Sequence, residues 1–419
     1  MKELLKNKNF ITLMLAQAIS GIGDWLSIVA IITMAGLKWE ASPLEVSLIF
    51  LCLALPMAFM GPVAGTAADR FDRKTLMILS DIVRAGFILV LTLADTLWIV
   101  YICLFIIGMF SAVFIPAKNG KLKEMVPDKH IKSAMSISAM IDSGTKVAGP
   151  LLSGILVAAV GSDLVFYLDG ATFMLSAFII LLLPKQGYLL HENKEPSSFR
   201  TDFILGLSYM KNHAFLLTGL FFFGVSLLLI QLADSQLIIL IRELTAASPD
   251  LFGYLVTLSG VGMFLAGSIL SAKTNYNTFL LMLGGMMGMA LSFGSMGIFT
   301  FFDMNLSIIW MPLLGFTAGF SASFVFVPFH ASIQSDTPVH LTGRVFGVTN
   351  SAATSATITG PLLGGWISTV IGVIPTFVVS ACLLLLLCLA GLFVKRKIRN
   401  GRSYPGTFHD KKDESSELA

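Results

Sequence analysis

A carboxylate at position 24 interrupts the first long apolar run of this chain. Gln17, Ser20 and Asp24 recur at i, i+3 and i+7, so they share one stripe of a helix. An ionisable group in a long apolar helix is costly unless it is paired, hydrated or neutralised. The stripe predicts a cavity-facing carboxylate that binds a cationic group or carries a proton, and the alternative is a hydrogen bond that packs neighbouring helices.

A second carboxylate, Asp142, lies four residues before Lys146, so the two side chains share a helical face and can neutralise each other. This pairing is the structural alternative to a functional role. An isolated ion pair has no favourable position facing lipid, so either interpretation directs both side chains into a bundle or a cavity. Because Lys146 would keep Asp142 ionised, Asp24 is the first candidate for a proton carrier and Asp142 the second.

Gln231, Asp234 and Ser235 recur at i, i+3 and i+4 and form a polar face near the end of a later apolar run. Contact with a substrate, an outer gate and simple interfacial solvation of Asp234 are all compatible with this face. Together with Gln17, Asp24, Asp142 and Lys146, residues Gln231 and Asp234 form the predicted substrate or proton pathway.

Three other charged residues in the apolar runs are not assigned to this pathway. Asp81 and Arg84 are three residues apart at the start of an apolar run, and they predict a structural charge pair that interacts with the basic loop 69–74. Asp169 lies inside another apolar run, and the sequence offers no partner for it.

No residues have the spacing of catalytic or metal-binding chemistry. The four cysteines lie inside apolar runs without His or Cys at ligand spacing, at Cys52, Cys103, Cys382 and Cys388. No nucleotide-binding loop of the G-x-x-x-x-G-K-[ST] kind occurs, which disfavours ATP-driven pumping by this chain. We expect no enzymatic activity, no catalytic residue, no metal and no cofactor.

The composition is that of a membrane protein. Of 419 residues, 55% are hydrophobic and 13% are Asp, Glu, Lys or Arg, with a mean hydropathy of +0.83. Such a chain cannot cover a soluble surface, so a soluble cytosolic enzyme is excluded. The net charge of +3 comes without a basic patch interleaved with aromatic residues, so nucleic acid is not an expected partner.

The apolar runs predict twelve membrane-spanning helices, because a span needs about 20 apolar residues. They lie near 10–36, 43–68, 76–95, 97–117, 133–160, 163–184, 214–241, 250–272, 278–301, 306–330, 345–370 and 372–394. With both termini cytoplasmic, the inner segments hold twenty-four basic residues and the outer segments hold Lys38 and Arg242. The positive-inside rule therefore predicts this orientation.

The spans form two halves around a polar stretch. We expect an N-terminal six-helix half at 1–184, a cytoplasmic linker at 185–213, a C-terminal six-helix half at 214–394, and a basic then disordered tail at 395–419. Ser198 is a plausible N-cap for a linker helix in which Phe199, Phe203, Leu207 and Met210 recur at helical spacing. This helix is expected to lie on the membrane surface.

The two halves also repeat in sequence. Pro116 matches Pro328, Pro127 matches Pro338, and Gly149-Pro150 matches Gly360-Pro361, all at an offset of 211 or 212. A repeat of six spans keeps its orientation in the membrane. The sequence therefore predicts two pseudo-symmetric halves related by an axis along the membrane normal, with a cavity between them.

The loop at 61–74, Gly-Pro-Val-Ala-Gly-Thr-Ala-Ala-Asp-Arg-Phe-Asp-Arg-Lys, resembles the G-x-x-x-D-R-x-G-R-K loop of the major facilitator superfamily. The resemblance covers residues 8–395, with Asp72 at the position of the usual Gly. The segments 21–25, 203–209 and 334–345 are similar to the macrolide efflux and enterobactin exporter group. The resemblance implies an all-α membrane protein with the twelve-helix major facilitator fold.

The resemblance also implies a conformational latch. Its residues would be Gly65, Asp69, Arg70, Arg73 and Lys74. In the family, the Asp at this position lies near the N-terminus of helix 11, whose positive dipole end stabilises a carboxylate in one state of the transport cycle. The alternative is ordinary cytoplasmic positive charge.

The family implies a function as a multi-pass exporter in the bacterial plasma membrane. We expect alternating-access export of amphipathic small molecules, of drug, macrolide or siderophore type, in exchange for protons and with the proton gradient as the energy source. The Gly149-Pro150 segment is similar to a motif of superfamily antiporters, although Thr145 replaces one of its glycines. Expected partners are the substrate, protons and the bilayer, and the chain is expected to be a monomer. The alternatives are a lipid or lysophospholipid flippase of the same fold and a non-transporting membrane sensor.

Overall fold

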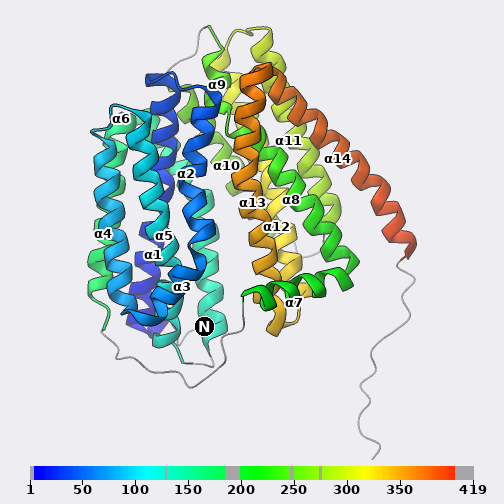
Figure 1. Cartoon of the computed structure of the whole chain (residues 1–419). Helices are drawn as coiled ribbons and strands as arrows, with labels where there is room; N and C mark the ends of the chain where they lie inside the picture. Colours follow the sequence, from blue (N-terminus) through cyan, green and yellow to red (C-terminus); the bar gives the residue numbers. More distant parts are fainter. Residues whose placement is uncertain (1–3, 128–129, 185–198, 246–249, 273–275, 402–419) are drawn as a thin grey trace, which may run out of the picture.

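The computed structural model describes residues 4–127, 130–184, 199–245, 250–272 and 276–401. All regular elements in these ranges are helices (Figure 1). Before the linker they are η1 (Leu4–Lys6), α1 (Lys8–Thr33), η2 (Met34–Lys38), α2 (Pro43–Phe59), α3 (Gly61–Arg70), α4 (Arg73–Leu91), α5 (Leu97–Met125) and α6 (Ile131–Leu181). After it come α7 (Phe199–Asn212), α8 (Ala214–Asp234), α9 (Leu237–Arg242), α10 (Leu251–Ala272), α11 (Thr278–Phe301), α12 (Ser307–Asp336), α13 (Val339–Ile371) and α14 (Val373–Gly401).

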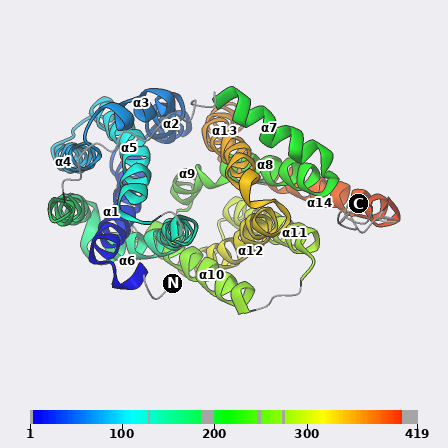
Figure 2. The same ribbon diagram turned by 90° about the horizontal axis from the view of Figure 1, so that it is seen from below.

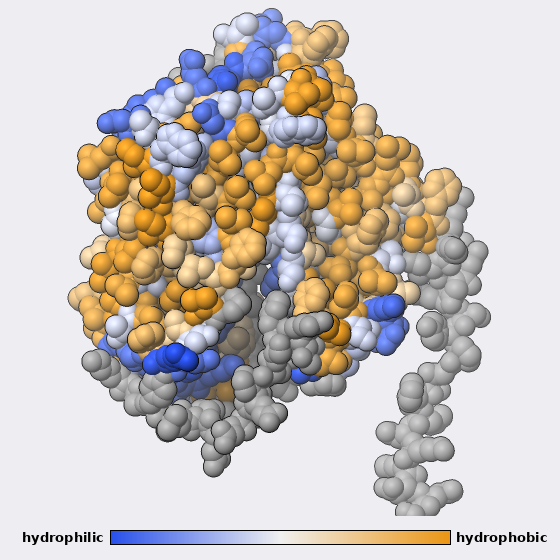
Figure 3. Space-filling view, viewed as in Figure 1, coloured by the Kyte–Doolittle hydropathy of each residue, from blue (hydrophilic) through white to orange (hydrophobic). Residues whose placement is uncertain are grey.

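The all-helical, multi-pass class is confirmed. Eight helices of the described residues are long and apolar enough to cross a membrane, or nine when α2 and α3 count as one span bent by 56°. The count of twelve stays a prediction. Helix α4 corresponds to a predicted span but is not among the eight, because its 19 residues carry four charged side chains, Arg73, Lys74, Asp81 and Arg84. Figure 3 shows an apolar band between two hydrophilic ends, as a membrane protein requires.

Two glycines break the helices at matching places in the two halves. The two limbs of α6 meet at Gly161 (φ 78°, ψ 169°), and Gly372 (φ 94°, ψ 158°) separates α13 from α14. These positive φ angles are readily adopted by glycine alone. The two breaks are 211 positions apart, which is the offset of the sequence repeat.

The Gly-Pro segments of the repeat also take equivalent places. Gly149 packs against Trp25 of α1, where a Cβ would lie 2.6 Å from the Trp25 side chain. Gly360 packs against Gln231 of α8 with a corresponding distance of 2.7 Å. In both cases the glycine approaches the helix that begins its own half.

The halves, α1–α6 and α8–α14, meet at the end of the bundle that holds α9, which we call the α9 end (Figure 1). There α6 packs on α10 so closely that a Cβ at Gly154 would lie 2.7 Å from the carbonyl oxygen of Gly253. At the opposite end, the α7 end, Cβ positions at Gly65 of α3 and Gly343 of α13 have no atom within 4 Å. The described close packing between the halves therefore lies at the α9 end, and Figure 2 shows the two groups of helices from the α7 end.

Helix α7 crosses the α7 end of the C-terminal half (Figure 1). Its Met210 is fully buried, and its Gly206 approaches α13 so closely that a Cβ would lie 2.6 Å from the carbonyl oxygen of Arg344. The Tyr209 hydroxyl donates to the backbone carbonyl of Asp336 (3.0 Å), and burial raises the pKa of Tyr209. The expected surface helix is thus packed onto α12 and α13.

Part of the linker prediction lies outside the described residues, namely 185–198 with the N-cap Ser198, and so does the tail beyond 401. Within α7 the apolar stripe is divided. Phe203 packs in the core of the C-terminal half, whereas Leu207 is exposed.

Candidate functional site

Arg84 of α4 is the centre of a charge cluster in the N-terminal half. Its Nη1 donates to Oδ1 of Asp24 on α1 (3.1 Å), and its Nη2 donates to the Asp81 carboxylate and to Ser20 Oγ (3.2 Å). One guanidinium therefore serves two carboxylates. Its planar fork of donors suits this arrangement, which the single ammonium of a lysine could not reproduce.

Aromatic rings enclose this guanidinium. Its carbon lies 4.7 Å from the ring centroid of Phe114 on α5 and 4.4 Å from that of Phe173 on α6. The Arg84 side chain is 2% exposed, so these cation–π contacts replace the hydration that it loses.

The sequence placed only Gln17 and Ser20 on the helical stripe of Asp24, and the structure adds Arg84 from another helix. Arg84 was expected to pair with Asp81 beside the 69–74 loop, and it does contact Asp81, but it also reaches Asp24. The Asp24 side chain is 46% exposed. Because a charged group is not tolerated against lipid, that exposed face must open between the helices of the bundle.

A second cluster surrounds Asp142 on the first limb of α6. Gln17 Nε2 donates to Asp142 Oδ1 (2.6 Å), and Gln17 Oε1 accepts from Ser138 Oγ (2.8 Å). Lys118 Nζ of α5 lies 3.3 Å from Asp142 Oδ2. The Asp142 side chain is 52% exposed and that of Lys118 is 6% exposed, so again an open carboxylate is backed by a buried cation.

Lys118 corrects a prediction about its own position. It was counted as a cytoplasmic residue after a span ending at 117, but α5 continues through Pro116 to Met125 and places Lys118 inside the bundle. Lys118 is also a cation paired with Asp142, and the predicted pairing of Asp142 with Lys146 stays a prediction. The side chain of Lys146 lies outside the described part of the chain.

Asp169, which had no partner recognisable in the sequence, is fully buried on the second limb of α6. Its carboxyl group contacts the hydroxyls of Ser27 on α1 and Thr172 on α6. Both partners are hydroxyl side chains within apolar runs. Such residues are too common in this sequence for their presence to identify the partners of Asp169.

The polar face of α8 lies on the other half. Asp234 is the last residue of α8 and is exposed, and Gln231 packs against Gly360. Among the described residues, no hydrogen bond joins this face to Asp24 or Asp142.

Residues that the sequence did not single out close the α9 end. Ser47 Oγ of α2 donates to the carbonyl of Pro361 on α13 (2.6 Å), and it accepts from Gln236 Nε2 (2.9 Å). Arg242 of α9 donates to the carbonyls of Ala41 (2.8 Å) and Gly36 (3.3 Å). Arg242 was one of the two basic residues predicted in the outer segments. The scarcity of basic residues in those segments is the signal that could have marked Arg242 as a structural contact.

The 61–74 loop is organised by its charged residues. Asp72 caps α4 by accepting from Thr75 N (2.9 Å), which explains how Asp replaces the usual Gly. Lys74 Nζ donates to the carbonyls of Leu181 (2.8 Å) and Leu183 (2.5 Å) at the end of α6. These contacts fasten the start of α4 to the rest of its half.

The other loop residues differ in exposure. Arg73 donates to Glu124 Oε1 (2.9 Å) on α5 and lies 3.5 Å from Asp69, whose side chain is 78% exposed. Arg70 is exposed, and Gly65 has open space beside it. The acidic member of the predicted latch thus projects outward at the α7 end.

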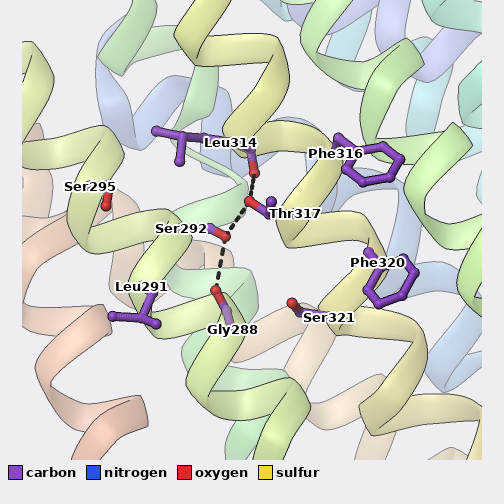
Figure 4. A pocket seen from close by; sticks show the side chains of 9 residues that line it. All are labelled: Gly288, Leu291, Ser292, Ser295, Leu314, Phe316, Thr317, Phe320 and Ser321. Atoms are coloured by element: carbon purple, nitrogen blue, oxygen red, sulfur yellow. Dashed lines mark hydrogen bonds between the residues drawn. The ribbon is translucent and has the colours of Figure 1, made fainter.

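A separate groove of about 470 Å³ lies between α11 and α12 (Figure 4). Ser292 donates to the Gly288 carbonyl (2.8 Å), and its hydroxyl lies 2.9 Å from that of Thr317. The groove is lined by apolar and hydroxyl side chains and includes none of the charged residues above. Across the described ranges, no three His, Cys, Asp or Glu side chains are placed to hold a metal ion.

Comparison with known proteins identifies the family. The family model described as "Major Facilitator Superfamily" matches residues 13–358. The chain is 39% identical over 407 residues to the "Uncharacterized MFS-type transporter YfiS" of Bacillus subtilis (strain 168), covering 96% of this chain and 97% of the relative. It is 26% identical to "Macrolide efflux protein A" of Streptococcus pyogenes, covering 91% and 94%.

A solved structure shows the same fold. A POT family transporter in complex with a thioalcohol-conjugated peptide superposes with a TM-score of 0.71 at 13% identity, covering 93% of this chain and 96% of that chain. The family match, the relatives over nearly the full length and the shared fold agree. The chain belongs to the Major Facilitator Superfamily of membrane transporters.

Proposed function

We propose that this transporter is a secondary active exporter of amphipathic small molecules that exchanges its substrate for protons by alternating access. The observation that carries the proposal is the pair of partly exposed carboxylates, Asp24 and Asp142, each backed by a buried cation, in a bundle closed at one end. A carboxylate that is open to water and held by a cation can exchange that cation for a proton or for a cationic substrate group.

Competition for these carboxylates would couple the two flows. A proton that binds Asp24 weakens its attraction to Arg84, and Arg84 keeps Asp81 as a counter-ion. A cationic amphipathic substrate would displace the proton from the same carboxylate on the cytoplasmic side. Antiport follows because the proton and the substrate cation cannot both occupy the site.

The relatives support the direction of transport. A protein named for macrolide efflux shares 26% identity over almost the whole chain. We extend that activity to this chain as export of drug-like amphipathic molecules, with twelve spans across the plasma membrane. Both termini and the α7 end are placed in the cytoplasm, since Arg73, Lys74 and Lys211 lie at that end.

The proposal is tested with a panel of substrates in inverted membrane vesicles under an imposed pH gradient. Cationic amphipathic drugs should accumulate in vesicles that contain the chain, and dissipating the gradient should release them. Vesicles without the chain are the control. Movement of a fluorescent lipid between leaflets without drug accumulation would instead establish a flippase. The absence of both drug accumulation and lipid movement would support the non-transporting sensor.

The orientation gives a prediction for cysteine labelling. In a variant whose four cysteines are replaced, Lys38→Cys should react with a membrane-impermeant maleimide added to intact cells, because it lies at the exposed end of η2. Lys211→Cys, at an exposed residue of α7 at the opposite end, should react only after the cells are opened. The reverse pattern would overturn the proposed topology.

The proposed latch gives a second prediction. Asp69→Asn should slow turnover about fivefold without loss of protein, because a carboxylate at a helix N-terminus contributes about 1 kcal/mol to one conformational state. Its exposed contact with Arg73 contributes little, and Arg73 retains Glu124. Initial transport rates and the amount of purified protein are measured together.

The matched control for the latch is Asp95→Asn, which removes an exposed carboxylate from the loop after α4. It should transport normally. Normal turnover in Asp69→Asn as well would show that the charges of the 69–74 loop only follow the positive-inside rule.

A further inference from the structure

Asp169 is sealed between α1 and α6. The residue is 0% exposed, and a Cβ at Gly23 of α1 would lie 2.5 Å from Asp169 Oδ1. Water is therefore kept from the carboxyl group on the α1 side. Its described side-chain contacts are two hydroxyls, Ser27 Oγ at Oδ2 and Thr172 Oγ1 at Oδ1, and not a cation.

The surrounding charges do not compensate an ionised Asp169. Asp24 from α1 and Arg84 from α4 lie within electrostatic reach of it. Arg84 already contacts two carboxylates, those of Asp24 and Asp81, and Lys118 of α5 is paired with Asp142. An ionised Asp169 would be a third carboxylate around one guanidinium, buried without hydration, which is strongly unfavourable.

The hydrogen bonds of Thr172 point to the same conclusion. Its Oγ1 lies 2.8 Å from the backbone oxygen of Asp169 and 3.3 Å from Asp169 Oδ1. A threonine hydroxyl has one proton, and the shorter contact is the favoured helical back-bond to a carbonyl. A carboxylate would then lack a donor at Oδ1. A carboxylic acid supplies its own proton there and donates it to Thr172 Oγ1, while Ser27 donates to Oδ2.

We infer that Asp169 is a second proton-binding site, occupied in this conformation and lying behind the carboxylate of Asp24. A proton from bulk water binds one carboxylate oxygen to give the neutral acid, and ionisation returns it to water when the packing of α1 on α6 loosens. A role of this proton in transport rests on the proposed function. The presence of the proton on Asp169 does not depend on that function.

Infrared spectroscopy tests this site directly. The purified full-length chain in lipid nanodiscs, without substrate or pH gradient, should show the C=O stretch of a buried carboxylic acid at neutral pH. Asp169→Asn should lose that band, and the control Asp163→Asn, which alters an exposed carboxylate, should keep it. An unchanged band in Asp169→Asn would overturn the inference.

Thermal unfolding of the same samples separates an acid from a structural carboxylate. An asparagine can accept from Ser27 and donate to Thr172, as the acid does, so Asp169→Asn should unfold at the parent's temperature, whereas Asp169→Leu should unfold earlier. Early unfolding of Asp169→Asn would overturn the inference by showing that the negative charge is required. Failure of uphill transport in the parent would instead count against the proposed function and leave the band unaffected.

Discussion

Asp24→Asn is expected to abolish efflux driven uphill by a pH gradient while passive substrate exchange survives. An amide cannot bind or release a proton, so the step that couples the gradient to transport is lost. The remaining charges stay balanced, because Arg84 keeps Asp81 as its partner. We therefore expect the protein to fold, and Asp142 remains as an exposed carboxylate for the cationic group of the substrate.

The measurement compares two modes of transport in the same proteoliposomes. Uphill efflux should fall to the background level, a loss of at least about tenfold for removal of a proton-transfer group, whereas counterflow exchange should still be measurable. Asp163→Asn is the control, since it removes an exposed carboxylate beside the Gly161 break. An undiminished uphill gradient would exclude Asp24 as the coupling site and direct attention to Asp142.

The largest effect on stability is expected for Arg84→Met. Asp81 is 0% exposed, and removing the guanidinium leaves its carboxylate buried without a cation. Breaking a buried ion pair in this way costs about 3–5 kcal/mol. The variant should show a sharply lower unfolding temperature in detergent and a lower yield of folded protein.

A double-variant cycle separates lost charge from lost packing. Adding Asp81→Asn to Arg84→Met removes the orphaned charge and should restore a large part of the stability. Lys211→Met, an exposed change at the end of α7, should have no measurable effect. If the double variant is as unstable as Arg84→Met, the packing of Arg84 between Phe114 and Phe173 accounts for the loss.

Much of the architecture follows from patterns that a sequence carries locally. The boundary predicted between spans 133–160 and 163–184 falls on Gly161, and the repeat offset places its counterpart at Gly372. A span predicted as one helix at 43–68 is instead broken near Met60, because Gly61 and Pro62 follow it directly. Apolar length identifies a span, but local backbone chemistry decides whether it is straight.

The site was less predictable, because its partners are far apart in the chain. Asp24 and Arg84 are separated by 60 residues, and Asp142 and Gln17 by 125. Helical spacing shows which residues share a face of one helix, but it does not show which face of another helix packs against them. The sequence therefore singled out the carboxylates, but it did not indicate that Arg84 contacts Asp24 or that Lys118 contacts Asp142.

The contacts that close the α9 end have a consequence for the kinetics of opening. They consist of glycine-mediated backbone packing and hydrogen bonds from Ser47, Gln236 and Arg242 to neutral acceptors, and none of these contacts joins opposite charges. Dissolved salt screens interactions between charges and leaves such packing almost unchanged. The two halves should therefore separate at the α9 end at nearly the same rate in dilute and in concentrated electrolyte. A change in the salt concentration around the cell should leave the rate of this opening step unaltered.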